Sequence, residues 1–197
     1  MEATNPTGLR GIDFVEIGSP EPARLDALLK TFGFSKLRTH PTLPIDLYRQ
    51  HDITFLVNRD EGSFADAFYK QHGPSICAMG WRVNHAQAAF DAAVARGARP
   101  YTGAARLAVD APAIYGIGDS VIYFIEANGP DRALDRIFLP LEAPEIVDDK
   151  GFLLIDHLTN NVEKGTMQRW ADFYKQVFGF TEVRYFDIRG VKTGLTS

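Results

Sequence analysis

The chain has 197 residues, of which 45% are apolar and 23% are charged, the usage of an ordinary globular protein rather than a disordered one. Its formal net charge of −4, with both signs interspersed, excludes a basic surface for nucleic acid and a polybasic membrane anchor. There is no signal-like leader, no apolar run of about 18 residues, and a single cysteine, Cys77, that cannot form an intrachain disulfide. We therefore expect a cytoplasmic protein that binds small molecules or other proteins.

The first part of the chain predicts a β-α-β-β-β unit. Residues 11–17, rich in Ile, Phe and Val, indicate a strand, and Ser19 is expected to cap a helix with Pro20 in its first turn. The expected buried face of this helix consists of Leu25, Leu28, Leu29 and Phe32. Three short strands are then expected at 34–39, 47–50 and 53–57.

The same pattern returns in the next part of the chain. A short helix around Phe64 and Phe68 precedes a strand over 76–83 and a helix that Asn84 is expected to cap. The buried face of this helix is expected to contain Ala89, Phe90, Ala93 and Val94, and Gly97 ends it. Further strands are expected near 100–102, at 107–109 and at 121–126. Residues 1–126 are therefore interpreted as one complete domain, and the Pro- and Asp-containing residues 127–150 as a linker.

Residues 151–197 repeat the start of the first unit. Residues 11–14 align with 154–157, and Phe32-Gly33-Phe34 aligns with Phe178-Gly179-Phe180. Residues 153–159 are expected to form a strand, Met167 to Phe178 a helix with an apolar stripe, and 181–188 and 191–196 two further strands. We expect this third unit to be the beginning of a second domain whose remaining strands lie outside the chain.

One substitution within the repeat carries chemistry, because His157 stands where the first copy has Phe14. Strand alternation would place His157 in an apolar row with Leu153 and Ile155. A core histidine with a satisfied hydrogen bond is the plainer interpretation. A metal ligand is the alternative, because a buried imidazole without a partner costs on the order of 1–3 kcal/mol and a metal would be such a partner.

The other histidines do not form a second candidate site. His40, His51, His72 and His85 have no His, Cys or carboxylate at ligand spacing. Gly116-Ile117-Gly118-Asp119 is not a phosphate loop, because no helix or lysine follows at the required offset.

The chain resembles bacterial 4-hydroxyphenylpyruvate dioxygenases over almost its whole length. The specific signal is Asp156-His157-Leu158-Thr159-Asn160-Asn161-Val162, supported by Leu47-Tyr48-Arg49-Gln50, His72-Gly73-Pro74-Ser75, Tyr185-Phe186-Asp187-Ile188-Arg189-Gly190 and Thr193-Gly194-Leu195-Thr196-Ser197. The resemblance implies an α+β vicinal oxygen chelate fold (glyoxalase/bleomycin-resistance-like), in which paired β-α-β-β-β units make an open barrel. The chain would then hold one complete non-catalytic barrel and the start of a catalytic one.

The resemblance also implies a non-haem Fe(II) dioxygenase. His157 would be the first of three iron ligands, the other histidine and the glutamate lying beyond Ser197, and Ser197 and Thr159 would contact the substrate. Two histidines and one carboxylate leave iron positions open for a 2-keto acid and dioxygen. The implied reaction is oxidative decarboxylation of 4-hydroxyphenylpyruvate with ring hydroxylation and side-chain migration, giving homogentisate in tyrosine and phenylalanine catabolism. The implied assembly is a homodimer or homotetramer.

Two alternatives stay open. A 4-hydroxymandelate synthase would use the same substrate and iron on the same scaffold and oxidise the benzylic carbon. A non-catalytic small-molecule binding protein of the same fold would keep His157 only as a relic. In either case we expect the 197 residues alone to be inactive and to bind iron poorly, because one imidazole is too few ligands.

Overall fold

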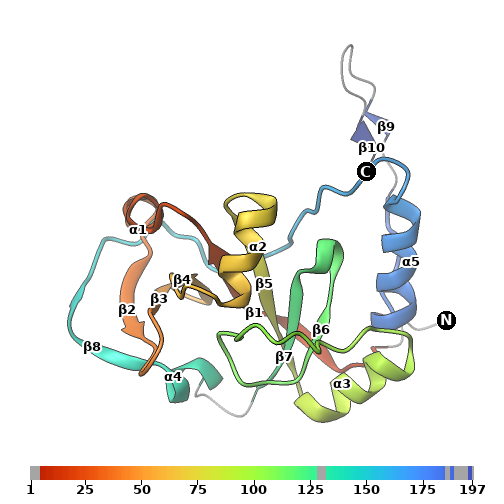
Figure 1. Cartoon of the computed structure of the whole chain (residues 1–197), viewed down its shortest axis with the longest axis horizontal. Coiled ribbons are helices and arrows are strands. Elements are labelled where there is room, and N and C mark those ends of the chain that lie inside the picture. Colours follow the sequence, from red (N-terminus) through yellow and green to blue (C-terminus); the bar gives the residue numbers. More distant parts are fainter. Residues whose placement is uncertain (1–4, 128–131, 185–186, 189–194, 197) are drawn as a thin grey trace.

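The computed structural model describes residues 5–127, 132–184, 187–188 and 195–196. They form an α+β fold built on an open eight-stranded mixed sheet (Figure 1). In chain order the elements are β1 (Leu9–Gly18), α1 (Pro22–Thr31), β2 (Ser35–Thr39), β3 (Ile45–Gln50), β4 (Ile53–Asn58), α2 (Phe64–His72), β5 (Ser75–Val83), α3 (Ala86–Ala95), β6 (Ala113–Tyr115), η1 (Ile117–Asp119), β7 (Val121–Glu126), α4 (Ala133–Ile137), β8 (Leu139–Glu145), α5 (Met167–Phe178), β9 (Asp187–Ile188) and β10 (Leu195–Thr196). No helix among the described residues is long and apolar enough to cross a membrane.

The sheet consists of two related halves joined through their first strands. Its strand order is β6-β7-β5-β1-β4-β3-β2-β8. In each half the first strand pairs in parallel with the last, β1 with β4 and β5 with β7, and β1 pairs antiparallel with β5. The repeated β-α-β-β-β pattern is thus confirmed for the first half, while the second half has one strand fewer.

Helices and loops cover both faces of this sheet. α1 packs on one face through Leu29, and α3 and α5 pack on the same face farther along the sheet, where Figure 1 shows them side by side. We call this the outer face. The opposite, inner face is covered by α2, α4 and the irregular segment 100–111.

The inner face is filled by side chains at its centre. Phe14 on β1 is fully buried, and its ring lies 5.6 Å, centroid to centroid, from the ring of Tyr123 on β7. On the neighbouring strand β5 it faces Gly80, where an added Cβ would overlap the Phe14 ring. The absence of a side chain at Gly80 therefore makes room for Phe14.

The segment expected to be a linker contributes a strand, β8, to the sheet. β8 pairs antiparallel with β2, with Lys36 opposite Glu145 and Thr39 opposite Leu139. β8 is the edge strand, a position that tolerates Pro140 and Pro144 because an edge N–H needs no ladder partner.

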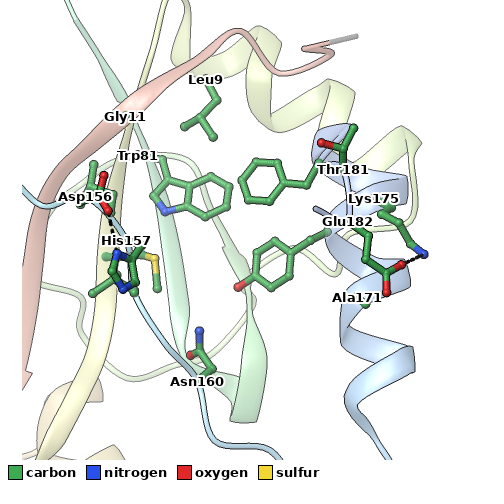
Figure 2. A pocket seen from close by; sticks show the side chains of 15 residues that line it. Leu9, Gly11, Trp81, Asp156, His157, Asn160, Ala171, Lys175, Thr181 and Glu182 are labelled. Carbon is green, nitrogen blue, oxygen red and sulfur yellow. Dashed lines mark hydrogen bonds and ion pairs between the residues drawn. The ribbon is translucent and has the colours of Figure 1, made fainter. Parts of the chain in front are cut away.

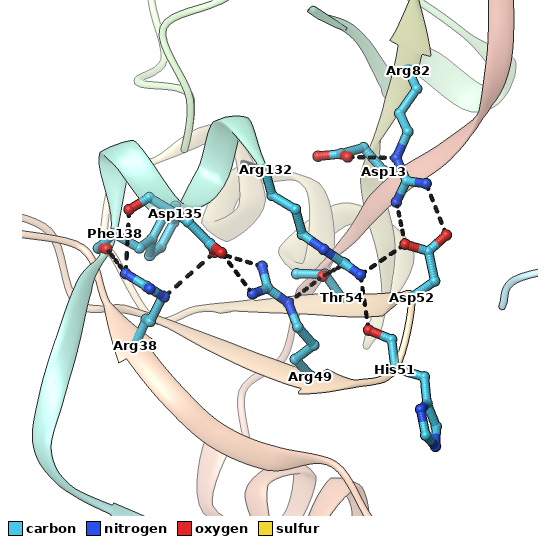
Figure 3. A network of polar contacts seen from close by, with 10 residues as sticks. All are labelled: Asp13, Arg38, Arg49, His51, Asp52, Thr54, Arg82, Arg132, Asp135 and Phe138. Atoms are coloured by element: carbon cyan, nitrogen blue, oxygen red, sulfur yellow. Dashed lines mark hydrogen bonds and ion pairs between the residues drawn. The ribbon is translucent and has the colours of Figure 1, made fainter. Parts of the chain in front are cut away.

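A network of arginines and aspartates ties this segment to the strand ends (Figure 3). Arg49 contacts both oxygens of Asp135 at 2.7 and 3.1 Å, and Arg132 donates to Asp52 at 2.8 Å. Asp52 also accepts two hydrogen bonds from Arg82, at 2.8 and 3.0 Å. Bidentate guanidinium–carboxylate pairs of this kind fix geometry as well as adding energy, so α4 is held in register with β3 and β4.

Both predicted helix caps are wrong. The first helix begins at Pro22 with Glu21 as its N-cap, because β1 continues to Gly18 and Pro22 suits a first-turn position whose N–H is unpaired. Ser19 instead accepts a hydrogen bond from the Glu21 amide at 3.1 Å. Asn84 likewise is not a cap, since the N-cap of α3 is His85.

Several predicted strands are also wrong. Residues 100–102 and 107–109 are not strands, and the strand that pairs with β7 is β6, which the sequence pattern missed. Residues 153–159 are irregular. Of the last two predicted strands, only β9 and β10 are observed, paired with each other, residues 181–184 are irregular, and 185–186 and 189–194 lie outside the described residues.

The contact between Phe14 and Gly80 leads to a testable prediction. Gly80→Ala should lower the free energy of unfolding by about 1–3 kcal/mol, because the new methyl overpacks the inner face. Urea unfolding measures this loss. Phe14→Leu should recover part of it in the double variant, and strictly additive single effects would contradict the contact.

Candidate functional site

A cavity of about 480 Å³ lies between the outer face of the sheet and α5 (Figure 2). Its walls come from β1, β5, the irregular segment 156–160, and α5 with the residues that follow it. The lining residues used below are His157, Asp156, Trp81, Tyr174, Phe180 and Lys175. Figure 2 shows the Asp156–His157 pair across the cavity from the Lys175–Glu182 pair.

An aromatic cluster forms one wall and holds α5 on the sheet. The Trp81 ring lies 4.4 Å from the ring of Phe178 in an edge-on arrangement and stacks on Phe180 at 5.9 Å, centroid to centroid. Val177 and Phe178 are almost fully buried. Arg96 at the end of α3 donates a hydrogen bond of 2.6 Å to the Gln176 carbonyl. The predicted apolar stripe of α5 is confirmed, and its partner is the N-terminal sheet.

Tyr174 and Lys175 give the α5 side of the cavity both apolar and charged groups. Burial raises the pKa of Tyr174 to about 12, so its phenol stays neutral at ordinary pH. Nζ of Lys175 lies 3.1 Å from Oδ1 of Asp172 and 3.3 Å from Oε2 of Glu182. Hydrogen bonds to these carboxylates raise the pKa of the Lys175 ammonium group. The helix side thus presents a neutral ring and a paired cation.

His157 lies at the edge of the cavity and is exposed. Its side chain is 74% exposed, and Nδ1 lies 2.8 Å from Oδ2 of Asp156. An ionised carboxylate can only accept, so in the neutral imidazole Nδ1 carries the proton in this pair and Nε2 keeps its lone pair. A histidine in this tautomer can offer Nε2 to a metal, and a carboxylate on the other nitrogen is a common accompaniment.

The predicted placement of His157 in a buried strand row is wrong. A strand needs a neighbour to pair with, and within the described residues segment 151–161 has none. It is held instead by single bonds, such as the Asp52 amide to the Leu153 carbonyl at 3.0 Å. Ile155 and Leu158 pack against the outer face, while Leu153 is 61% exposed.

The three predicted site residues are not brought together in one cavity. Thr159 lines a separate cavity of about 310 Å³, bounded by α2, β5 and η1 and by Asn160 and Asn161. Ser197 lies outside the described residues. The part of the chain that the structure describes contains no group of three or more His, Cys, Asp or Glu side chains arranged to hold a metal ion. The donors described there do not fit Fe(II), because no three of them converge on one point.

Sequence reasoning missed the role of Trp81. Nothing in its own strand indicates that its ring contacts Phe178 on α5. The aromatic residues on α5 were a signal that this helix needs a large apolar partner.

Comparison with known proteins places the chain in a family. The sequence profile described as "Hydroxyphenylpyruvate dioxygenase, HPPD, N-terminal" matches residues 3–137, a span that includes β1 to β7 and α4 and ends before β8 and His157. The chain belongs to this family. The vicinal oxygen chelate fold expected from the sequence is thereby confirmed.

Individual relatives extend the match past the family profile. The chain is 50% identical over 194 residues to Protein MelA of Shewanella colwelliana, covering 98% of this chain and 56% of that protein. It is 41% identical over 201 residues to a 4-hydroxyphenylpyruvate dioxygenase of Pseudomonas sp. (strain P.J. 874), covering 98% of this chain and 55% of that enzyme. The chain thus spans a little over half the length of these relatives.

A solved structure resembles the fold of the chain. A xylose isomerase-like TIM barrel/4-hydroxyphenylpyruvate dioxygenase fusion protein superposes with a TM-score of 0.79 at 29% identity, covering 94% of this chain and 30% of the fusion protein.

The Trp81 contact can be tested against a second tryptophan. Trp81→Ala should remove hydrogen-exchange protection from α5 while the amides of β1, β3 and β4 stay protected, because the ring joins helix to sheet. Trp170→Ala is the matched control, since Trp170 is only partly buried and lies at the far end of the helix from Phe178. Equal loss of α5 protection in both variants would show that the Trp81 contact is not the anchor.

Proposed function

We propose that the chain is the N-terminal part of an Fe(II)-dependent 4-hydroxyphenylpyruvate dioxygenase, to which it contributes one metal ligand, His157. The observation that carries the proposal is the exchange of Phe14 for His157 between equivalent positions of the repeat. At the first position the Phe14 ring is fully buried against Gly80 and Tyr123, which leaves no space for a metal beside it. At the second, an imidazole with an available Nε2 faces open space.

The 41% identity to a 4-hydroxyphenylpyruvate dioxygenase supports this assignment beyond the family profile. Fe(II) dioxygenases of the two-histidine, one-carboxylate type need two more donors, which the described residues do not supply. In the proposed enzyme these donors come from a catalytic unit that begins at residue 151, after a linker over 127–150. The iron would supply the oxygen chemistry when bound, and the residues of this chain would position and shield it.

Further roles follow from the same proposal. Thr159 and Ser197 contact the 2-keto acid substrate once the catalytic unit is assembled, and dioxygen is the second substrate. The enzyme acts in the cytoplasm, in tyrosine and phenylalanine catabolism, as a homodimer or homotetramer. Assembly must move segment 151–161 from its irregular path into a paired strand, since only then do His157 and Thr159 share one face.

The decisive test uses a complete polypeptide that contains this sequence. With Fe(II) and 4-hydroxyphenylpyruvate it should consume oxygen and release homogentisate, and His157→Ala should abolish turnover without loss of stability, because the side chain is mostly exposed. Full oxygen uptake by the His157→Ala variant would refute the ligand assignment. Release of 4-hydroxymandelate would instead identify the synthase reaction, and binding without turnover a binding protein.

A simpler measurement concerns the 197 residues alone. Anaerobic calorimetric titration with Fe(II) should show no stoichiometric binding at micromolar concentrations, because one exposed imidazole offers too few ligands. His157→Ala serves as the blank. Tight one-to-one binding that the substitution abolishes would show that the chain forms a metal site by itself.

A further inference from the structure

Glu16 is a carboxyl group buried in the centre of the inner face. It lies on β1 two residues after Phe14 and therefore on the same side of the strand. It is 1% exposed and is surrounded by the inner-face core. Asn58 on β4 donates to its Oε1 at 2.8 Å, and the hydroxyl of Tyr123 on β7 lies 3.4 Å from its Oε2. Within the described part of the chain, no Lys, Arg or His forms an ion pair with Glu16.

Ionised Glu16 is poorly accommodated in this setting. A carboxylate offers about four lone-pair sites, and here it meets two neutral donors in place of water. Burial raises the pKa of Glu16 from its usual 4.5 to about 7, while the bonds to Asn58 and Tyr123 oppose part of the shift. The folded protein thus holds a proton on Glu16 at pH values where a solvated glutamate has lost it.

Tyr123 connects Glu16 to the segment that covers the inner face. Besides facing Glu16, the Tyr123 hydroxyl accepts a hydrogen bond from the Ala108 amide at 3.2 Å. Ala108 and Val109 are buried over the core, in the irregular segment 100–111. Any movement of Ala108 therefore opens a route from solvent to the Glu16 carboxyl.

This segment is the wall around Glu16 that consists of irregular backbone, and an ion pair between Arg106 and Asp60 helps to hold it. The other walls are the strands β1, β4, β5 and β7, which are paired with one another, and the helices α2 and α4. The cover is held by separate hydrogen bonds. Among them, the Tyr101 amide donates to the Ala113 carbonyl at 2.9 Å and the Phe64 amide donates to the Arg106 carbonyl at 3.0 Å. Water that solvates an ionised Glu16 enters most easily where this cover lifts.

Two further titratable groups, Tyr123 and Cys77, lie beside Glu16. Burial raises the pKa of both Tyr123 on β7 and Cys77 on β5, whose thiol lies 3.5 Å from the Glu16 carbonyl, so both stay neutral. Asp60, whose amide donates to Asn58, is paired with Arg106 on the cover. His40 contacts Phe138 of the same core, and burial lowers its pKa, so the Glu16→Gln variant is needed to separate its titration from that of Glu16.

We propose that segment 100–111 is a pH-gated cover over the inner face, whose opening is coupled to the loss of one proton from Glu16. At low pH the closed cover excludes water from Glu16, and Glu16 stays protonated. As the pH rises, opening is increasingly favoured because the opened state admits water and releases the proton. The opening equilibrium depends on pH between the pKa of Glu16 in the open, solvated state and its pKa in the closed state. Above the pKa of the closed state the equilibrium no longer changes with pH.

Hydrogen exchange of the Ala108 amide in the 197-residue chain measures this opening directly. After correction for intrinsic chemistry, its protection should fall about tenfold per pH unit between about pH 5 and about pH 7 and then level off. Glu16→Gln should abolish this slope, whereas the exposed control Glu142→Gln should keep it. A slope that persists in Glu16→Gln, or no slope in the unmodified chain, overturns the proposal.

Two further measurements keep the proposal falsifiable if Glu16→Gln does not fold. Carboxyl ¹³C NMR should show Glu16 titrating near pH 7, and a midpoint at the ordinary value overturns the coupling. The amides of β5 should exchange far more slowly than that of Ala108, because their ladders stay closed. Equal rates would mean that the whole sheet unfolds and that no separate cover exists.

Discussion

The packing of Phe14 against Gly80 and Tyr123 is the constraint on which the rest of the structure depends. It closes the inner face at the position where the repeat later carries His157. Once this position is filled by an aromatic ring, the first two β-α-β-β-β halves can serve as a packed platform but not as a metal centre. The proposed chemistry would then belong to the third copy, which has His157 at the equivalent position of the repeat.

The segments that follow the platform in the chain are joined to it at two places. At one, Arg38 on β2 and Arg49 on β3 form ion pairs with Asp135, and β8 extends the sheet. At the other, Trp81 and its aromatic neighbours bury the end of α5 on the outer face. Between these anchors runs the irregular segment that carries His157. The anchors fix where the segment begins and ends, while its conformation depends on strands that must pair with it.

Local pattern sufficed for most of the elements that are buried on one side. The strands at β1, β3, β4, β5 and β7 and the stripe of α5 were predictable because burial on one side imposes a period of two or 3.6 residues. The predicted helix caps at Ser19 and Asn84 were wrong, because the position of an N-cap depends on the residue at which the preceding strand ends. Residues 153–159 have a strand-like composition but remain irregular, because strand formation requires a neighbour that composition does not reveal. Glu16 could have been noticed, since the alternation that buries Phe14 also buries the residue two positions later.

The account is tested most directly by locating iron in the complete polypeptide. Crystals grown with Fe(II) and measured at the iron absorption edge should show anomalous scattering within bonding reach of Nε2 of His157 and none on the inner face around Phe14. Iron bound elsewhere, with the imidazole of His157 turned away from it, would contradict the assignment of this residue as the metal ligand that the chain provides.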